Sequence, residues 1–374
     1  MTVSIGVAGG QGLIGKGVCK ALIEGGKVDR VVALDLKTSG TIKEVEEIIV
    51  DAHDKPALVK EFKDLDLVVN IVAPYYRHGT AVADAALEAG IHYTDACADI
   101  EITKALLDQH QTWKDAGLTL MTGLGASPGL TNMYVKLLAS RFDEILEAHV
   151  IWATGGAEVE SQEESTGTLE DFIKEEFGEI PTYMDGHYVN VIGFLDGAEE
   201  VQFGDWTITV YHSGHSEPIT IPRFIPEIRT VSCKGNVAPF GVVQLIQKAV
   251  EIGLQSDKRI KVAGRKLTPL TFLTAYINSP IAFSYYDLES LKFPGGLQVK
   301  VIGLRDGKQE IEIENLVSDA VSETANMASS TAGPIAVVSE AIALGEVKLR
   351  GAYAPEALDA KLINKLLEEI MNRV

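Results

Sequence analysis

The sequence predicts an α/β protein whose first domain is a doubly wound parallel sheet and whose second domain is mixed α/β with a largely antiparallel sheet. Three observations carry this prediction. Strand and helix patterns alternate up to Gly123, strand patterns dominate beyond Asn132, and 374 residues are enough for two domains. We expect one domain over residues 1–130, a second over 131–330, and final helices over 331–374.

The first strand, the first helix and the second strand follow from local patterns. Val3 to Ala8 is a short apolar, β-branched run typical of a buried strand. Leu13 to Ile23 carries apolar residues at helical spacing, and RVVALD, Arg30 to Asp35, predicts the second strand. A glycine-rich stretch joins the first strand to the helix.

That stretch, VAGGQGLIGKG, can be parsed in two ways. Gly10, Gly12 and Gly15 form G-x-G-x-x-G, whereas Gly10, Gly15 and Lys16 form most of a Walker A phosphate loop. A Walker A loop needs Ser or Thr after its lysine to hold magnesium, and Gly17 stands there. The dinucleotide-binding (Rossmann) parse is therefore favoured.

Each glycine of this turn has an expected task. Gly10 allows the tight turn, Gly12 lets the backbone approach the pyrophosphate, and Gly15 lets the helix pack on the strand. The pyrophosphate then lies at the positive end of the helix, which adds Leu13 and Ile14 to the predicted cofactor contacts.

Asp35 is the predicted contact to the adenosine ribose. It ends the second strand, 20 residues after Gly15, where a carboxylate accepts hydrogen bonds from the ribose hydroxyls. Its charge repels a 2′-phosphate, so NAD is favoured over NADP. Lys37 and Lys43 lie nearby in the sequence and soften that preference, so NADP stays an alternative.

The rest of the first domain continues the alternation. We expect a strand ending at Asp51, a helix from Lys55 capped by Asp54, a strand over Leu65 to Ala73, a helix over Thr80–Ala89, a strand in HYTDA, a helix from Ile100 and a strand in LTLMTG. Ligands of such sheets lie beyond the carboxyl ends of the strands. The predicted cofactor contacts there are Asp51, Ala73, Pro74, Tyr75 and Asp95.

The segment GLGASPGLTN, Gly123 to Asn132, leads into the second domain. Ser127 before Pro128 predicts a helix N-cap followed by proline at the first helical position. The alternative adds an anion pocket at that helix start, for a carboxylate or the cofactor.

The second domain is rich in strand patterns. They lie in EAHVIWATGG, YVNVIGF, WTITVYHSG, RTVSCKG and LQVKVIGLRDGKQEIEIEN. The last contains Asp306-Gly307, a hairpin turn signal between two alternating strands, and Gly241–Ile252 reads as a helix.

Composition excludes several classes of function. A formal net charge of −20 repels nucleic acid and anionic membranes, so neither is expected as a partner.

We find no signal peptide and no apolar run of membrane-spanning length. Three cysteines far apart, Cys19, Cys97 and Cys233, fit a reducing cytoplasm without disulfides. No metal site is expected, because no C-x-x-C or clustered Cys/His pattern occurs.

The chain resembles the saccharopine dehydrogenase and L-lysine 6-dehydrogenase family. The resemblance rests on GGQGLIG, NIVAPYYRHGTAVADAALEAGIHYTD and AGLTLMTGLGASPGLTN, and more weakly on YHSGHSEPITIPRFIPEIRTVSCKGN and SEAIALGEVKLRGAYAPE. It implies that the second domain covers the active site and supplies a dimer interface. It also implies that the final helices, Gly333–Leu344 and Pro355–Met371, return to the first domain.

The resemblance implies an NAD(P)-dependent oxidoreductase that acts on a C–N bond of a small amino-acid substrate. Oxidative deamination of lysine at its ε-amino group is favoured, as in L-lysine 6-dehydrogenase. The alternative is an imine reductase of the saccharopine or carboxynorspermidine type, whose carboxylate-rich substrates call for convergent arginines. A second alternative is a dinucleotide-binding sensor without turnover. HSGHS stands where lysine dehydrogenases carry small residues, which keeps the substrate open.

Oxidation of a C–N bond needs a base for the nitrogen proton and groups that orient the substrate. PYYRHG and DACAD occupy strand ends, while HSGHS and a nearby arginine belong to the second domain. The catalytic candidates are Tyr75, His78, Asp95, Asp99, His212, His215 and Arg223. Helix capping, loop hydrogen bonds and surface exposure are the alternatives for each, and Cys97 is expected to be a packing residue.

Overall fold

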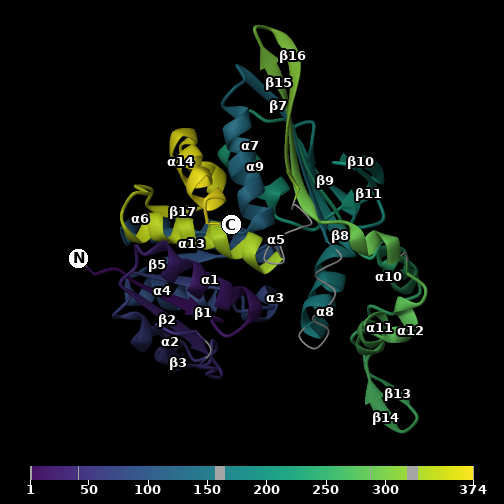
Figure 1. Cartoon of the computed structure of the whole chain (residues 1–374), viewed down its shortest axis with the longest axis horizontal. Helices are drawn as coiled ribbons and strands as arrows, with labels where there is room; N and C mark the ends of the chain where they lie inside the picture. Colours follow the sequence, from purple (N-terminus) through teal and green to yellow (C-terminus); the bar gives the residue numbers. More distant parts are fainter. Residues whose placement is uncertain (1, 41, 156–164, 287, 318–326, 374) are drawn as a thin grey trace.

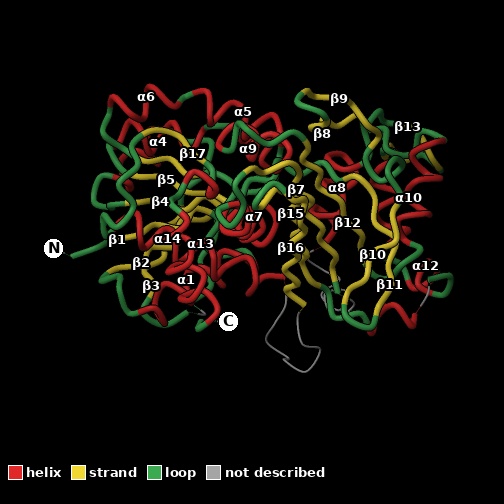
Figure 2. The backbone as a smooth tube through the Cα atoms, turned by 90° about the horizontal axis from the view of Figure 1, so that it is seen from above, coloured by secondary structure: helices red, strands yellow, loops and turns green. Residues whose placement is uncertain are grey.

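The computed structural model describes residues 2–40, 42–155, 165–286, 288–317 and 327–373. Two sheets lie side by side, with helix α7 (Thr131–Ala139) between them (Figure 1, Figure 2). This arrangement confirms the predicted α/β fold of a parallel sheet followed by a mixed α/β unit.

The first sheet has seven parallel strands in the order β17-β6-β5-β4-β1-β2-β3. They are β1 (Ser4–Ala8), β2 (Arg30–Asp35), β3 (Val45–Ile49), β4 (Leu67–Asn70), β5 (His92–Asp95), β6 (Thr119–Met121) and β17 (Gly351–Tyr353). The third strand ends at Ile49 rather than at Asp51. Strand β17 was not predicted, because three residues are too short for a detectable pattern.

Helices cover both faces of this sheet. Those of the first domain are α1 (Leu13–Gly25), α2 (Lys55–Phe62), α3 (Tyr75–His78), α4 (Ala81–Ala89), α5 (Ile100–Asp108) and α6 (His110–Asp115). Val31 and Ala33 of β2 belong to the core that includes α1, whereas Val32 and Leu34 belong to the core that includes α2, α4 and α5. Burial on both faces explains the uninterrupted apolar strand sequences.

The second sheet has eight strands. They are β7 (Glu144–Thr154), β8 (Glu179–Met184), β9 (His187–Ile192), β10 (Glu199–Phe203), β11 (Trp206–His212), β12 (Thr230–Val237), β15 (Gly296–Arg305) and β16 (Lys308–Val317). β12 and β7 run parallel, and the other pairs of described strands are antiparallel. Asp306 and Gly307 have φ angles of 52° and 74°, as the predicted hairpin turn requires.

The helices of the second domain lie around this sheet. They are α8 (Ser165–Glu176), α9 (Glu217–Phe224), α10 (Val242–Glu251), α11 (Pro269–Ile277), α12 (Pro280–Phe283) and η3 (Leu288–Lys292). A separate hairpin of β13 (Ile260–Val262) and β14 (Arg265–Leu267) projects from the far end (Figure 1).

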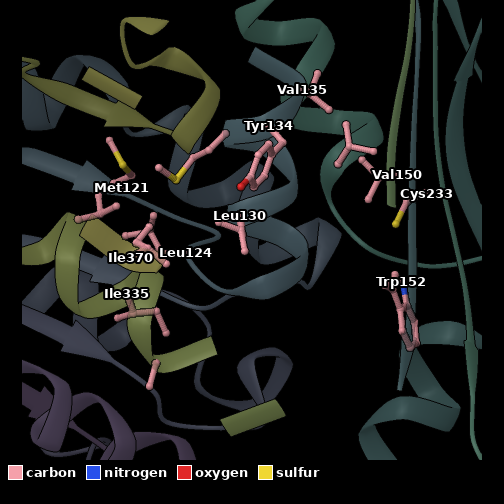
Figure 3. Close-up of a cluster of buried hydrophobic side chains, with 14 of the residues drawn as sticks. Met121, Leu124, Leu130, Tyr134, Val135, Val150, Trp152, Cys233, Ile335 and Ile370 are labelled. Atoms are coloured by element: carbon pink, nitrogen blue, oxygen red, sulfur yellow. The ribbon is translucent and has the colours of Figure 1, made fainter. Parts of the chain in front are cut away.

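One apolar core runs from the first sheet through α7 to the second. Figure 3 shows part of it, with Met121 of β6, Leu130 and Tyr134 near the start of α7, and Val150 of β7. The C-terminal elements α13 (Met327–Ala343), η4 (Pro355–Ala357) and α14 (Ala360–Met371) complete it. Helix α13 packs on α1, and α14 packs on α7 and α13, so the chain returns to the first domain as expected.

A buried polar network also joins the two domains. The Asn132 side-chain amide on α7 donates hydrogen bonds to Thr220 Oγ1 on α9 at 3.1 Å and to Glu356 Oε2 on η4 at 3.0 Å. All three side chains are buried, and Glu356 has no exposed surface. Burial raises the pKa of Glu356 to about 7, against a model-peptide value of 4.5.

No helix among the described residues is long and apolar enough to cross a membrane.

The raised pKa of Glu356 predicts a pH dependence of stability. Because the folded protein holds this proton more tightly than the unfolded chain, the free energy of unfolding falls as the pH rises from about 4.5 to 7, by about 3 kcal/mol. The Glu356→Gln variant lacks this ionisation. The difference in free energy of unfolding between the variant and wild type should therefore shift in favour of the variant by about 3 kcal/mol from pH 4.5 to pH 8. Urea unfolding at the two pH values measures this difference.

The matched control is Glu24→Gln, whose side chain is 62% exposed and pairs with Lys20. It should shift stability by less than about 0.5 kcal/mol at either pH. An identical pH dependence in wild type and Glu356→Gln would contradict the assignment.

Candidate functional site

The glycine turn closes as a dinucleotide-binding turn does, although the tasks of its glycines differ from those expected. Gly9, not Gly10, has the positive φ, 81°, and its N–H donates to Leu34 O at 2.8 Å. A Cβ on Gly10 would lie 2.7 Å from the Ala33 side chain. A Cβ on Gly15 would lie 2.1 Å from Gly9 O, so Gly15 does allow the close packing of helix and turn.

Asp35 faces this turn from the end of β2. Its Oδ2 accepts a hydrogen bond from Gln11 N at 3.0 Å, and its Oδ1 accepts one from Leu36 N at 2.7 Å. Beyond it, the Glu47 carboxylate accepts from the backbone N–H groups of Ser39 and Gly40. Two carboxylates therefore lie along the edge where the ribose is expected.

Asp95 links the ends of two neighbouring strands by hydrogen bonds, and its carboxylate is not accessible to solvent. Its Oδ1 accepts from Cys97 N at 3.0 Å, Gly123 N at 2.9 Å and Thr122 Oγ1 at 2.8 Å. The side chain is 0% exposed, and this burial raises its pKa. These bonds hold the loops after β5 and β6 together at the carboxyl edge of the sheet.

The neighbouring candidates Tyr75 and Asp99 also hold the backbone of this edge. The Tyr75 hydroxyl donates to Asn70 O at 2.9 Å and accepts from Ala96 N at 3.2 Å, so it joins the ends of β4 and β5. Pro74 caps α3 directly before Tyr75. Asp99 is the N-cap of α5 and accepts from Ile102 N at 2.8 Å.

Asp51 and His78 both contact His53. Asp51 Oδ1 accepts from His53 N at 2.9 Å, and the hydrogen bonds from His53 lower the pKa of this exposed carboxylate. The His78 ring lies 4.6 Å from the His53 ring, centroid to centroid. Partial burial lowers the pKa of His78, which keeps its imidazole neutral near pH 7.

The predicted helix start at Ser127 and Pro128 was wrong. Ser127 has φ −144° and ψ 116°, Pro128 has ψ 165°, and the regular helix begins at Thr131. The Gly129 N–H is capped by Asn132 Oδ1 at 2.8 Å. Ser127 Oγ does not cap this helix and instead donates to the Glu217 carboxylate at 2.5 Å.

The second-domain candidates do not converge. His212 is 5% exposed, lies beside Gly197, and burial lowers its pKa to about 4. Arg223 extends to the surface of the first domain, where its guanidinium donates to Leu107 O at 2.9 Å and pairs with Asp108 at 3.3 Å. The proposed fork to a substrate carboxylate is therefore not available to Arg223 in this arrangement.

His215 alone among the candidates lies in a polar cluster at the junction of the domains. Its Nε2 is 3.3 Å from Glu176 Oε1, its Nδ1 is 3.4 Å from Ser127 Oγ, and Nδ1 is 4.0 Å from Glu217 Oε2. Glu176 is 5% exposed at its side chain and Glu217 is 0% exposed. Within the described residues, each of these two glutamates forms its ion pair with His215.

Trp152 and Ser213 fix the geometry around His215. The indole stacks on the imidazole with centroids 5.0 Å apart and planes 9° apart, and its Nε1 donates to Ser213 Oγ at 3.0 Å. Ser213 Oγ and Gly214 N both donate to Glu176 Oε2, at 2.8 and 2.6 Å. Gly235 makes room, since a Cβ there would meet the indole at 2.3 Å.

Sequence reasoning missed Glu176, Glu217 and Trp152, and it expected no metal site because no C-x-x-C or clustered Cys/His pattern occurs. The fold brings further side chains beside His215. His215, Glu217 and Cys233 each place a donor atom within 4.8 Å of the other two. Glu217 was detectable, because it follows His215 by two residues and precedes a proline. Cys233 lies on β12 and Glu176 on α8, and no local pattern connects them to His215.

Comparison with known families matches nearly the whole chain. Residues 5–121 match the family described as saccharopine dehydrogenase NADP binding domain, and residues 125–374 match saccharopine dehydrogenase C-terminal domain.

Individual relatives are distant. A carboxyaminopropylagmatine dehydrogenase from Synechocystis sp. is 24% identical over 84% of this chain and 81% of its own length. An NADP⁺, L-glutamate-forming saccharopine dehydrogenase from Pyricularia oryzae is 23% identical over 59% of this chain, and the match spans half of that relative. An L-Glu-forming saccharopine dehydrogenase from Saccharomyces cerevisiae has the same fold, with a TM-score of 0.70 and 15% identity over 99% of this chain and 97% of that one.

The hydrogen bonds of Asp95 predict that its replacement by alanine destabilises the protein more than the same replacement of Asp99, four residues later. Asp95→Ala leaves three buried donors without their acceptor and should lower the free energy of unfolding by about 3 kcal/mol or more. Asp99→Ala removes one N-cap bond and should cost about 1 kcal/mol. Urea unfolding measures both. Equal losses in the two variants would rule out the role given to Asp95.

Proposed function

The chain belongs to the saccharopine dehydrogenase family, and from this premise we propose that it oxidises the ε-amino group of lysine, or of a close lysine analogue, with NAD⁺. Family membership makes it a dehydrogenase that uses a nicotinamide dinucleotide and acts on amino-acid-like substrates. The choice of lysine rests on the distribution of arginines.

A substrate with two or three carboxylates needs several arginines that point to one place. Arg223 is the arginine nearest in sequence to HSGHS, and it is engaged with Asp108. Three further arginines of the second domain, Arg229, Arg259 and Arg265, are exposed. None of these four arginines forms a hydrogen bond or ion pair with His215, Glu176 or Glu217 among the described residues. This favours a substrate with a single carboxylate and a cationic amine, such as lysine, over saccharopine.

The proposed reaction centre lies at the carboxyl edge of the first sheet. We propose that Gly10, Gly12, Leu13, Ile14 and Gly15 receive the pyrophosphate, that Asp35 receives the ribose, and that Ala73 and Pro74 border the nicotinamide. The Ser127 loop and His215 then bring the second domain to the substrate. The protein's task is to align the reacting C–H with the nicotinamide and to exclude water.

A second candidate function is oxidation of a secondary amine, or reduction of the matching imine. It is favoured by the relative from Synechocystis sp., a carboxyaminopropylagmatine dehydrogenase, because that match covers most of both chains. A substrate of that class carries a guanidinium group, which also suits a His215 cluster that none of the four arginines above contacts.

We further propose a homodimer formed through the second sheet. Strand β16 is one of the edge strands of that sheet among the described residues, and its Ile311 and Ile313 are 54% and 50% exposed. Exposed apolar residues on an edge strand are a hazard unless another chain covers them. Light scattering after gel filtration tests the proposal, and a monomeric mass would reject it.

The experiment for the activity is formation of reduced nicotinamide by purified protein. NAD⁺ or NADP⁺ is mixed with lysine, ornithine, saccharopine, diaminopimelate, agmatine derivatives or short diamines. We expect reduction with lysine and NAD⁺. Reduction only with a secondary amine would establish the second candidate. NADH binding without turnover on any substrate would reject both and point to a sensor.

Asp35 gives a prediction for cofactor choice. In Asp35→Ser the ribose acceptor and its negative charge are lost, so kcat/KM with NAD⁺ should fall about 10-fold and the NADP⁺/NAD⁺ ratio should rise more than that. Asp64→Ser is the matched control, because Asp64 lies on the loop before β4, at the opposite edge of the sheet. An unchanged ratio in Asp35→Ser would remove Asp35 from the cofactor site.

A further inference from the structure

We infer that His215, Glu217 and Cys233 form a binding site for a divalent transition-metal ion, with zinc as the best-suited ion. Each of the three residues offers one donor atom, and these atoms lie within 4.8 Å of one another. His215 Nδ1 is 4.0 Å from Glu217 Oε2. Zinc takes imidazole nitrogen, carboxylate oxygen and thiolate sulfur, whereas magnesium and calcium take oxygen only. A donor set with one nitrogen, one oxygen and one sulfur therefore selects zinc or a similar ion.

The Glu217 carboxylate points to the same conclusion. Its Oε1 accepts hydrogen bonds from Ser127 Oγ at 2.5 Å and Thr131 Oγ1 at 3.1 Å. Its Oε2 is buried and has no hydrogen-bond partner among the described residues, although it lies 4.0 Å from His215 Nδ1. A buried carboxylate oxygen without a donor is costly, and a cation at that position would satisfy it.

His215 is oriented as metal-binding histidines are. The Nε2 atom faces Glu176 Oε1 at 3.3 Å, and a proton held there leaves the Nδ1 lone pair free for an ion. Glu176 is itself held by Ser213 and Gly214, and Trp152 stacks on the ring. The imidazole thus has its plane fixed by an indole and its second nitrogen fixed by a carboxylate.

The charge balance of the cluster also favours a cation. Glu176 and Glu217 are buried and, within the described residues, their ion pairs are with His215 alone. Cys233, 1% exposed on β12, lies beside this cluster as a neutral thiol, because burial raises its pKa. Two buried carboxylates around one imidazole carry excess negative charge, and burial makes that excess expensive.

The site has three protein donors on two segments. Cys233 comes from strand β12, whereas Glu217 starts α9 and His215 lies in the loop directly before it. Three donors leave a fourth tetrahedral position, as in zinc sites that bind a water or a substrate atom. Ser127 Oγ lies 3.4 Å from His215 Nδ1 and 2.5 Å from Glu217 Oε1. The inference does not depend on the proposed substrate.

The test measures metal, not activity. Full-length protein without a histidine tag is stripped with a chelator, mixed with zinc chloride, separated from free ion, and analysed for zinc by mass spectrometry. We expect about one zinc per chain and a zinc-dependent rise in the melting temperature. Replacement by Co²⁺ should produce visible d–d bands of a tetrahedral site and a near-ultraviolet thiolate-to-metal band.

Variants locate the ion. Cys233→Ser should abolish the thiolate band and weaken zinc binding more than 10-fold, and His215→Gln should do the same to binding. Glu176→Gln, which alters only the group behind the imidazole, should weaken it about 10-fold. Cys97→Ser and His212→Gln are matched controls that keep full binding. Circular dichroism confirms that each variant is folded.

Three results would overturn the inference. They are less than 0.1 zinc per chain in the reconstituted wild type, a cobalt spectrum without a thiolate band, and equal zinc affinity in wild type and Cys233→Ser. The first would leave the cluster as a Glu–His–Glu ion pair that shares protons. Because none of these readouts uses dehydrogenase turnover, a failed activity assay and a failed metal site remain distinguishable.

Discussion

Helix α7 must bury side chains against both sheets, and the rest of the structure depends on this double burial. Its Met133, Tyr134 and Val135 belong to the same core as Met121 of the first sheet and Val150 of the second. Helix α14 packs on α7, and α7 packs on β15. If either sheet moved away from this helix, the apolar helix face that it covers would be exposed to water. The burial of both faces therefore holds the two domains in one arrangement.

That arrangement determines where polar groups are buried. Asn132 on the same helix contacts Thr220 and Glu356, and Ser127 just before it contacts Glu217. The junction is therefore both apolar and polar, with hydroxyl and amide donors satisfying most of the buried carboxylate oxygens. The exceptions are Glu217 Oε2, Glu356 Oε1 and Asp95 Oδ2, which are buried without a hydrogen-bond partner among the described residues. Leaving such atoms without a donor costs free energy unless a proton or a cation satisfies them.

The junction of the two domains also connects the carboxyl edge of the first sheet to the second domain. Asp95 and Tyr75 hold the strand ends of the first sheet as a firm backbone border, and the chain then passes through Gly123 and Ser127 to reach α7. Their hydrogen bonds fix the backbone of the edge at which we propose that the dinucleotide binds. The cluster around His215 stands on the opposite side of the junction, carried by the second sheet and α9. A substrate at this junction would meet the cofactor on one side and a strongly negative cluster on the other.

The sequence by itself determined six of the seven strands of the first sheet, the glycine turn after β1, the place of Asp35 at the end of β2, and the family, because each depends on neighbouring residues along the chain. Strand periodicity, a run of glycines and a carboxylate at a strand end are local signals. Only the tertiary structure decided which candidate side chains lie in contact with one another. His212 and His215 are three residues apart and face different surroundings, whereas His215 meets Glu176 on α8 and Cys233 on β12. Strand order and helix packing make those contacts, and neither is encoded in the spacing of the residues concerned.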